Sequence, residues 1–248
     1  MDHPVPRLLA EIVQDMAEIA FPGGGFFVEA GAHDGLTQSN TARLSAAKWS
    51  GLLVEPSPTA FRKLQENRPE CILANVALVE KDNMLSLTGT FSEGSLMGSA
   101  HPDYRYRTPT LNATFFSKVA KKLRLAVGLK ANIITIEVRA KTLDRLVQDH
   151  AIQSIDILVL DIEGLELEAL RGFGFRPRPR VIIIETRYEL AAEINNLMLS
   201  KDYVLARNFS NFSKQVSPQF TEDLQDYVWI PNDDYATLAA VLAVEMFV

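Results

Sequence analysis

The sequence predicts an α/β fold in which a mostly parallel, twisted sheet has helices on both faces. Short apolar runs alternate with segments of helical periodicity along most of the chain, and several of these runs end in an acidic residue. Such alternation is typical of a parallel sheet that is buried on both faces. A final pair of apolar runs near the C-terminus predicts antiparallel closing strands.

The first half of the chain sets up this alternation. Apolar residues at helical spacing predict an N-terminal helix at 6–20, and the run Phe21-Pro22-Gly23-Gly24-Gly25 ends it. Strands are then expected at 26–30, 51–55 and 71–75, with helices at 38–48 and 58–67 between them.

The alternation breaks between about 80 and 140. Residues 91–110 are rich in glycine, serine, proline and aromatics without a clear period, and long segments of this kind are usually functional lids or disordered. A basic helix at 112–126 and a strand at 132–139 are expected after it. We therefore predict a single domain, 1–248, with a lid or acceptor-binding insertion at about 80–140.

Alternation resumes in the second half. Helices are expected at 142–150, 165–171 and 188–200, and strands at 155–160 and 181–185. The segments 203–207 and 226–230 flank a polar loop, and they form the predicted antiparallel pair.

Composition narrows the classes of protein. The 248 residues are 47% hydrophobic and carry a net charge of −6, which argues against a general nucleic-acid binder. The single cysteine, Cys71, excludes an internal disulfide framework. No leader and no apolar run of about 20 residues is visible, so a cytoplasmic protein without a membrane span is expected. The apolar tail 235–248 leaves core packing or a homo-oligomer contact as alternatives.

Four of the expected strands end in an acidic residue: Glu29, Glu55, Asp161 and Glu185. Ligands of open α/β sheets bind at the carboxyl ends of the strands, so these acids predict a cofactor site. The glycines of the first turn, Gly31 and Gly35, do not form the G-x-G-x-x-G fingerprint, and Asp34 between them would repel phosphate. S-adenosylmethionine therefore fits better than a dinucleotide.

Three blocks of the sequence resemble the FkbM-type methyltransferases. They are the segment Phe27 to Thr41, the segment Trp49 to Pro58, and the run Ile155-Asp-Ile-Leu-Val-Leu-Asp-Ile-Glu-Gly-Leu-Glu-Leu-Glu-Ala-Leu-Arg-Gly172. The resemblance implies a class I methyltransferase Rossmann-like fold. It also implies S-adenosylmethionine-dependent methylation, most often of a hydroxyl on a sugar or another small secondary metabolite.

The same resemblance assigns the cofactor site. Glu29, Gly31 and Gly35 would shape its methionine end, Glu55 would hold the ribose, and Asp161 would stand between donor and acceptor. The full set of implied cofactor contacts is Glu29, Gly31, Ala32, His33, Gly35, Ser39, Glu55, Pro56, Ser57, Asn75, Val76, Ala77, Asp161 and Glu163.

Catalytic candidates are fewer. A base is needed only if the acceptor hydroxyl must lose its proton near the transition state. The candidates are His33 in the turn 31–35, which we call the cofactor turn, His101 on the expected lid, and Asp161. A backbone role for His33 and a surface role for His101 are the alternatives. Asp161, Glu163 and Glu185 are the only candidates for a divalent metal such as Mg²⁺, which is not favoured because no local spacing motif enforces a site.

The acceptor is expected to be a small molecule. Lysines and arginines between 105 and 130 suggest either a solvated helix face or a patch that steers an anionic, sugar-like acceptor. Two other functions stay open: a non-catalytic binding or scaffold protein that keeps the fold, and a nicotinamide-dependent oxidoreductase.

Overall fold

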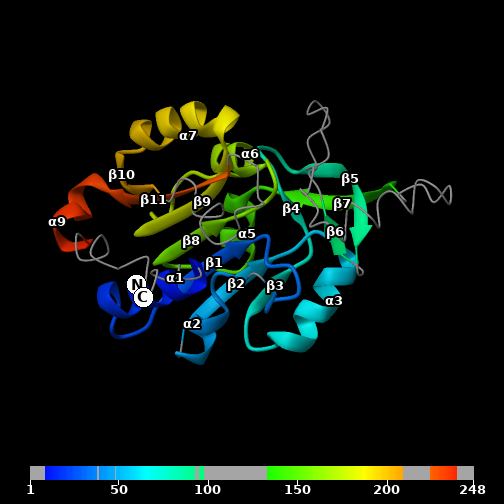
Figure 1. Ribbon diagram of the computed structural model, residues 1–248, viewed down its shortest axis with the longest axis horizontal. Helices are drawn as coiled ribbons and strands as arrows, with labels where there is room; N and C mark the ends of the chain where they lie inside the picture. The colour runs from blue at the N-terminus through cyan, green and yellow to red at the C-terminus, as the bar shows by residue number, and fades with distance from the viewer. Residues whose placement is uncertain are drawn as a thin grey trace, which may run out of the picture.

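A computed structural model describes residues 9–37, 39–47, 49–92, 95–97, 133–208 and 224–238. Its centre is a seven-stranded sheet of order β10-β11-β9-β8-β1-β2-β3 (Figure 1). These strands are β1 (Phe26–Ala30), β2 (Ser50–Val54), β3 (Ile72–Ala74), β8 (Ile157–Leu160), β9 (Val181–Arg187), β10 (Tyr203–Asn208) and β11 (Leu224–Pro231). Strand β11 runs antiparallel to both of its neighbours, whereas the other pairs are parallel.

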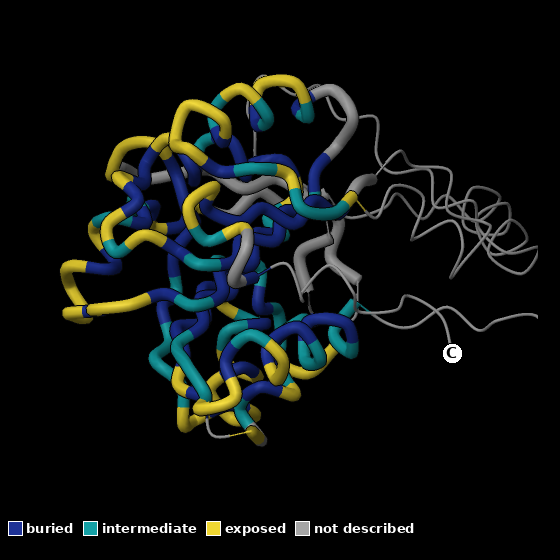
Figure 2. Tube along the Cα trace, turned by 90° about the vertical axis from the view of Figure 1, so that its left-hand side faces the viewer, coloured by how far each residue is buried: buried dark blue, intermediate teal, exposed yellow. Residues whose placement is uncertain are grey.

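Helices cover both faces of this sheet, as the sequence predicted. On one face lie α1 (Leu9–Ala20), α2 (Ala42–Ala46), α3 (Pro58–Asn67) and, after the short 3₁₀ helix η1 (Asn232–Asp234), α9 (Tyr235–Leu238). On the other lie α5 (Leu143–Asp149), α6 (Glu166–Arg171) and α7 (Tyr188–Ser200). Successive strand residues point to opposite faces, so Phe27 packs in one core and Val28 in the other. Buried residues accordingly follow the central strands (Figure 2).

Side-chain caps fix where two of the helices begin. The Ser57 hydroxyl accepts a hydrogen bond from the N–H of Ala60, and Pro58 occupies the first turn of α3. The Thr142 hydroxyl likewise accepts from the N–H of Arg145 at the start of α5. Both arrangements satisfy an N–H group that a helix start leaves without a partner.

The ends of the predicted insertion form a second sheet of order β4-β7-β5-β6. Its strands are β4 (Ala77–Leu78), β5 (Asn83–Ser92), β6 (Ser95–Met97) and β7 (Ile133–Lys141). The strand expected at 132–139 is confirmed as β7, whereas β5 was not predicted. The expected basic helix at 112–126 lies outside the described residues. Within the described part of the chain, no helix is both long and apolar enough to span a membrane.

Candidate active site

The turn after β1 is held against the ends of two neighbouring strands. The N–H groups of Gly31 and Ala32 donate to the carbonyl oxygen of Val54, at 3.0 and 3.1 Å. Gly31 has a φ of +87°, and a Cβ there would lie 1.7 Å from the carbonyl oxygen of Asp161. Only glycine therefore allows the ends of β1, β2 and β8 to meet so closely.

Glu55 lies directly after β2 and is 7% exposed. Its Oε2 accepts a hydrogen bond from the N–H of His33 at 2.9 Å, and its Oε1 accepts one from the N–H of Ser57 at 2.7 Å. Burial raises the pKa of Glu55 to about 7, although both hydrogen bonds oppose the shift. The carboxyl group is thus fixed in orientation, and each oxygen keeps a lone pair for a further donor.

The residues predicted to lie near adenine occupy the loop after β2, the loop after β3 and the start of β4. Asn75, after β3, donates from Nδ2 to the carbonyl oxygens of Glu55 and Pro56, at 2.8 and 3.1 Å. It therefore ties the loop after β3 to the loop after β2. Ser57, Val76 and Ala77 are buried beside it. Adenine contact by these residues stays a prediction.

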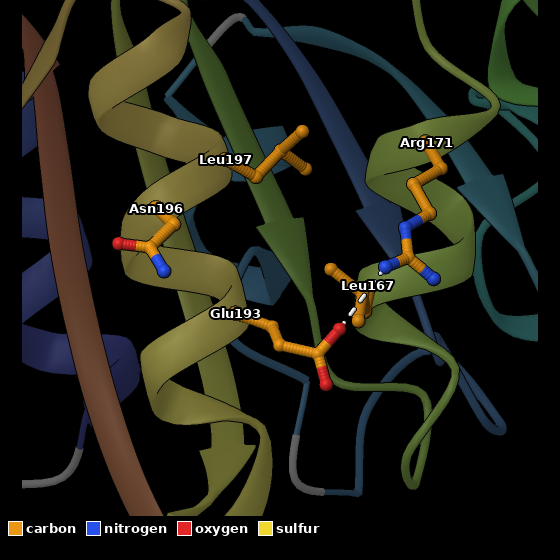
Figure 3. Close-up of a pocket in the computed structure, with 5 residues that line it drawn as sticks. All are labelled: Leu167, Arg171, Glu193, Asn196 and Leu197. Atoms are coloured by element: carbon orange, nitrogen blue, oxygen red, sulfur yellow. Dashed lines mark hydrogen bonds and ion pairs between the residues drawn. The ribbon is translucent and has the colours of Figure 1, made fainter.

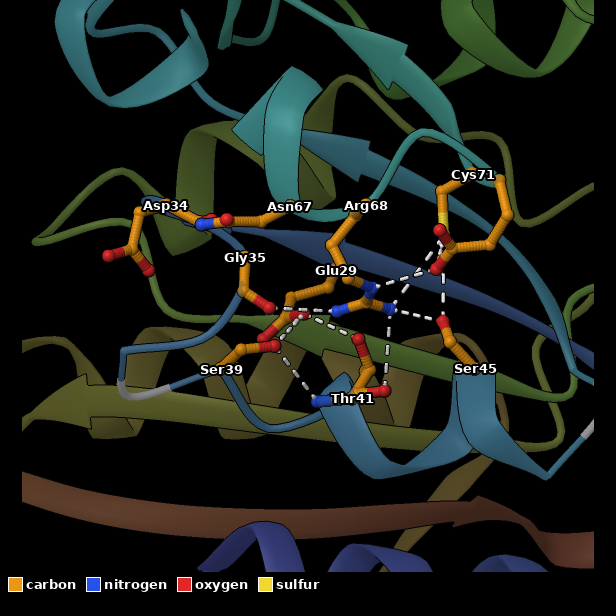
Figure 4. A network of polar contacts seen from close by, with 10 residues as sticks. Glu29, Asp34, Gly35, Ser39, Thr41, Ser45, Asn67, Arg68 and Cys71 are labelled. Carbon is orange, nitrogen blue, oxygen red and sulfur yellow. Dashed lines mark hydrogen bonds and ion pairs between the residues drawn. The ribbon is translucent and has the colours of Figure 1, made fainter. Parts of the chain in front are cut away.

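Glu29, in β1, is buried and holds the segment that follows the turn (Figure 4). Its Oε1 accepts from the N–H of Asn40 at 2.7 Å, and its Oε2 accepts from the hydroxyls of Ser39 and Thr41 at 2.9 and 2.5 Å. Burial raises the pKa of Glu29 against these hydrogen bonds. In this structure, Glu29 shapes the site by organising residues 39–41.

Three carboxyl groups lie side by side at the carboxyl ends of β8 and β9. Glu185 in β9 is the register partner of Asp226 in β11, and Asp161 follows directly after Leu160, the partner of Ile184. Asp161 and Glu185 share a side-chain hydrogen bond. We call Asp161, Glu185 and Asp226 the carboxyl row.

The carboxyl row retains protons near neutral pH. Burial and the charge of Glu185 raise the pKa of Asp161 well above its usual range. Burial, with charge repulsion inside the group, raises the pKa of both Glu185 and Asp226 to about 7. The row can therefore both donate and accept hydrogen bonds at its protonated and ionised members.

A buried glutamate fixes the turn that carries Asp161 and Glu163. Glu163 and Gly164 have φ values of +56° and +100°. The Oε1 of Glu166 accepts from the N–H groups of Ile162 and Gly164, at 2.9 and 3.1 Å. Burial raises the pKa of Glu166 to about 7.

Of the two candidate histidines, only His33 lies among the described residues. His33 lies in the cofactor turn with a φ of +50°, and its Nδ1 is 3.6 Å from Oδ1 of Asp34. Its N–H is bound by Glu55, which is the backbone role considered above, and its role as a base stays a prediction. His101 lies outside the described residues.

The metal candidates gain no support from the geometry. Among the residues with described positions, no group of three or more His, Cys, Asp or Glu side chains is arranged to hold a metal ion. Asp161 and Glu185 instead form a side-chain hydrogen bond with each other.

A shallow groove of about 370 Å³ lies elsewhere, between α6 and α7 (Figure 3). Across it, Nη2 of Arg171 donates to Glu193 at 3.0 Å. None of the predicted site residues lines the groove, whose lining consists of Leu167, Arg171, Glu193, Asn196 and Leu197.

The sequence analysis assigned no role in the site to three residues that shape it: Arg68, Glu166 and Asp226. Asp226 precedes an apolar run, but only the insertion of β11 beside β9 brings it next to Glu185. Glu166 was visible two residues after Gly164, where a carboxylate can reach back to a tight turn.

Comparison with known proteins gives two kinds of likeness. A methylase of a ribosomal protein from Lactobacillus delbrueckii subsp. bulgaricus is 8% identical, with a TM-score of 0.46 over 90% of this chain and 78% of that one. A TehB-like SAM-dependent methyltransferase from Corynebacterium glutamicum is 11% identical, with a TM-score of 0.42 over 90% of this chain and 86% of that one. No protein of curated function matches the sequence.

The second likeness is at the level of sequence. Residues 29–205 match the family described as the methyltransferase FkbM domain. The match begins at the buried Glu29 of β1 and ends in β10, so it includes the cofactor turn, Glu55 and two members of the carboxyl row. The chain belongs to the FkbM methyltransferase family.

Proposed function

We propose that this protein transfers a methyl group from S-adenosylmethionine to a hydroxyl of a sugar or another small metabolite. The observation that carries the cofactor assignment is the fixed carboxyl group of Glu55. It stands at the end of β2, one strand from the glycine turn, with free lone pairs for two vicinal ribose hydroxyls.

The hydrogen bonds inside the turn argue against a dinucleotide. Asp34 Oδ1 accepts from the N–H groups of Leu36 and Thr37, at 3.0 and 2.7 Å. Burial alone would raise the pKa of Asp34, but these bonds and that from the Thr37 hydroxyl lower it. N–H groups that could cradle a pyrophosphate are thus occupied by a carboxylate, which supports a cofactor without phosphate.

The residues of the chain would mainly bind and orient. S-adenosylmethionine supplies an activated methyl group when bound, so alignment of the acceptor accounts for much of the rate. Glu55 would hold the ribose, and Gly31 allows the turn to pass close to Asp161. The carboxyl row would accept hydrogen bonds from acceptor hydroxyls, and an ionised member would take up the proton that is released.

The carboxyl row favours a neutral, hydroxyl-rich acceptor. Its ionised members would repel a phosphate placed beside them, whereas its protonated and ionised members together can exchange several hydrogen bonds with hydroxyls. The lysines that suggested an anionic acceptor lie outside the described residues.

Calorimetric titration tests the cofactor assignment. S-adenosylhomocysteine should bind the wild-type protein, and NADH should give no response. Glu55→Gln should weaken S-adenosylhomocysteine binding about 10- to 100-fold, because it removes a charged acceptor from the ribose. The control is Glu193→Gln, which alters an exposed glutamate in the groove between α6 and α7, where none of the predicted site residues lies. Binding of NADH instead would support the oxidoreductase alternative, and unchanged affinity in Glu55→Gln would refute its ribose role.

Methyl transfer separates an enzyme from a scaffold. With S-adenosylmethionine labelled in its methyl group, we expect label in neutral sugars before their phosphorylated forms. Binding of S-adenosylhomocysteine without transfer to any hydroxyl compound would favour the non-catalytic alternative.

A further inference from the structure

Arg68 is a buried cation directly after α3, and its side chain reaches the loop that follows the cofactor turn (Figure 4). It is 3% exposed. Its guanidinium lies 5.7 Å from the ring centroid of Phe27 in β1, and Nη2 donates to the Ser45 hydroxyl at 2.5 Å. These contacts anchor the guanidinium between the sheet and α2.

The guanidinium also contacts the main chain at both ends of the loop 35–41. Nη1 donates to the carbonyl oxygen of Gly35 at 3.0 Å, and Nη2 makes a longer contact of 3.5 Å to that of Thr41. The neighbouring Asn67 donates from Nδ2 to the carbonyl oxygen of Asp34 at 2.8 Å. The end of α3 therefore holds the loop through main-chain atoms.

Glu29 holds the same loop through other atoms. Its carboxyl group accepts from Ser39, Asn40 and Thr41. Burial raises the pKa of Glu29, and the charge of Arg68 opposes this rise. The described residues of this loop, 35–37 and 39–41, thus lie between a carboxylate that accepts from their donors and a guanidinium that donates to their carbonyl oxygens.

We propose that Arg68 is a positioning residue of the cofactor site, whose forked guanidinium fixes the loop 35–41 in its binding conformation. The inference rests on the proposed function, because this loop carries the predicted cofactor contacts Gly35 and Ser39. Arg68 acts through the loop, since its guanidinium donates to the carbonyl oxygens of Gly35 and Thr41. Its other hydrogen bonds go to Ser45 in α2 and to Glu70 and Cys71 just after α3.

Lysine cannot replace this fork. Two nitrogens of one planar group reach two carbonyl oxygens of the loop, whereas lysine offers a single ammonium on a flexible stem. Arg68→Lys keeps the charge that compensates Glu29 and removes the geometry. Arg68→Met removes both.

The test combines ligand affinity with local amide exchange. Arg68→Lys and Arg68→Met should each raise the Kd for S-adenosylhomocysteine about tenfold or more. In the ligand-free protein, amides of 35–41 should exchange faster, whereas those of β9 stay as in wild type. If Arg68→Met fails to fold, Arg68→Lys carries the test alone.

Arg178→Met is the matched control. Arg178 also donates to a main-chain carbonyl, that of Asp202 at 2.8 Å, and lies over an aromatic ring, that of Tyr203 at 5.2 Å. It lies before β9, at the amino ends of the parallel strands, whereas the cofactor turn lies at their carboxyl ends. Its removal should leave the Kd within about twofold of wild type.

Four results would overturn the inference: wild-type affinity in Arg68→Lys, an equal loss of affinity in Arg178→Met, exchange that rises equally in β9, or unchanged exchange of 35–41 in Arg68→Lys. A wild-type protein that does not bind S-adenosylhomocysteine would refute the proposed cofactor. The exchange measurement would still test whether Arg68 fixes the loop, because unchanged exchange of 35–41 in Arg68→Lys overturns the inference without any ligand.

Discussion

Gly31 is the described glycine at which an added side chain would clash most severely. Alanine there would combine a φ of +87° with a Cβ 1.7 Å from the carbonyl oxygen of Asp161. We expect Gly31→Ala to lower the free energy of unfolding by about 3 kcal/mol or more, measured by urea denaturation. Gly23→Ala, where an added Cβ meets nothing within 4 Å, should change it by less than about 1 kcal/mol. Equal stabilities of the two variants would contradict the described turn.

Glu55 gives a residue-scale prediction about pH. Its pKa of about 7 means that the carboxylate, the better acceptor for ribose hydroxyls, prevails above neutral pH. The affinity for S-adenosylhomocysteine should therefore fall as the pH drops from about 8 to about 6, by up to about tenfold per pH unit. Calorimetry at several pH values should show this slope in wild type and a flatter one in Glu55→Gln. The same slope in both proteins would assign the titration to another group.

The sequence predicted some of these residues and not others for a physical reason. Glu55 was predictable because an apolar run that ends in acid places its carboxyl group at the edge of the sheet. Arg68 lies at the end of a helix, and its sequence neighbours Asn67 and Glu70 are exposed, so nothing local indicates that its guanidinium is buried. Its partners Gly35 and Thr41 are distant along the chain and meet it only after folding.

At the scale of elements, the carboxyl row depends on the pairing of β11 with β9. The folded-state pKa values of Glu185 and Asp226, about 7, exceed their ordinary values of 4.5 and 3.8. At pH values between the unfolded-state and folded-state pKa values, the folded protein binds more protons than the unfolded chain. The contribution of these two carboxyl groups to the free energy of unfolding is therefore complete below about pH 4, and it is lost as the pH rises through about 7.

Asp226→Asn should remove part of this pH-dependent loss of stability, because asparagine does not ionise. We expect this variant to exceed wild type in free energy of unfolding at pH 8, by on the order of 2 kcal/mol, and the difference should shrink toward pH 5. Urea denaturation across this range measures it, with Glu193→Gln expected to follow the wild-type curve. A variant less stable than wild type at pH 8 would show that ionised Asp226 is compensated in the fold.

The elements themselves were predicted unevenly. Strands β1, β2 and β8 were predictable because each is a short apolar run bounded by turn residues or helices. β5 was not predicted. Leu85 and Leu87 alternate with Ser86 and Thr88, but this short period of two lies where the alternation of strands and helices breaks down. The position of β11 between β9 and β10 depends on long-range pairing, which the antiparallel prediction alone did not specify.

At the scale of the whole molecule, a parallel sheet collects the carboxyl ends of distant strands at one edge. Glu29, Glu55, Asp161 and Glu185 come from separate strands along the chain, and the order β9-β8-β1-β2 makes those strands neighbours. The two ends of this set differ chemically. Glu55 is held by main-chain N–H groups, whereas Asp161 and Glu185 are hydrogen-bonded to each other. This difference supports one site with two ends, in which Glu55 marks the cofactor end and Asp161 and Glu185 mark the acceptor end.

A crystal structure of the protein with S-adenosylhomocysteine tests this account most directly. We predict that both ribose hydroxyls lie within hydrogen-bonding distance of Glu55 and that the sulfur faces the carboxyl row. Segment 35–41 should keep its contacts with Arg68 and Glu29. A nucleoside bound away from Glu55, for example in the groove between α6 and α7, would contradict the proposed site.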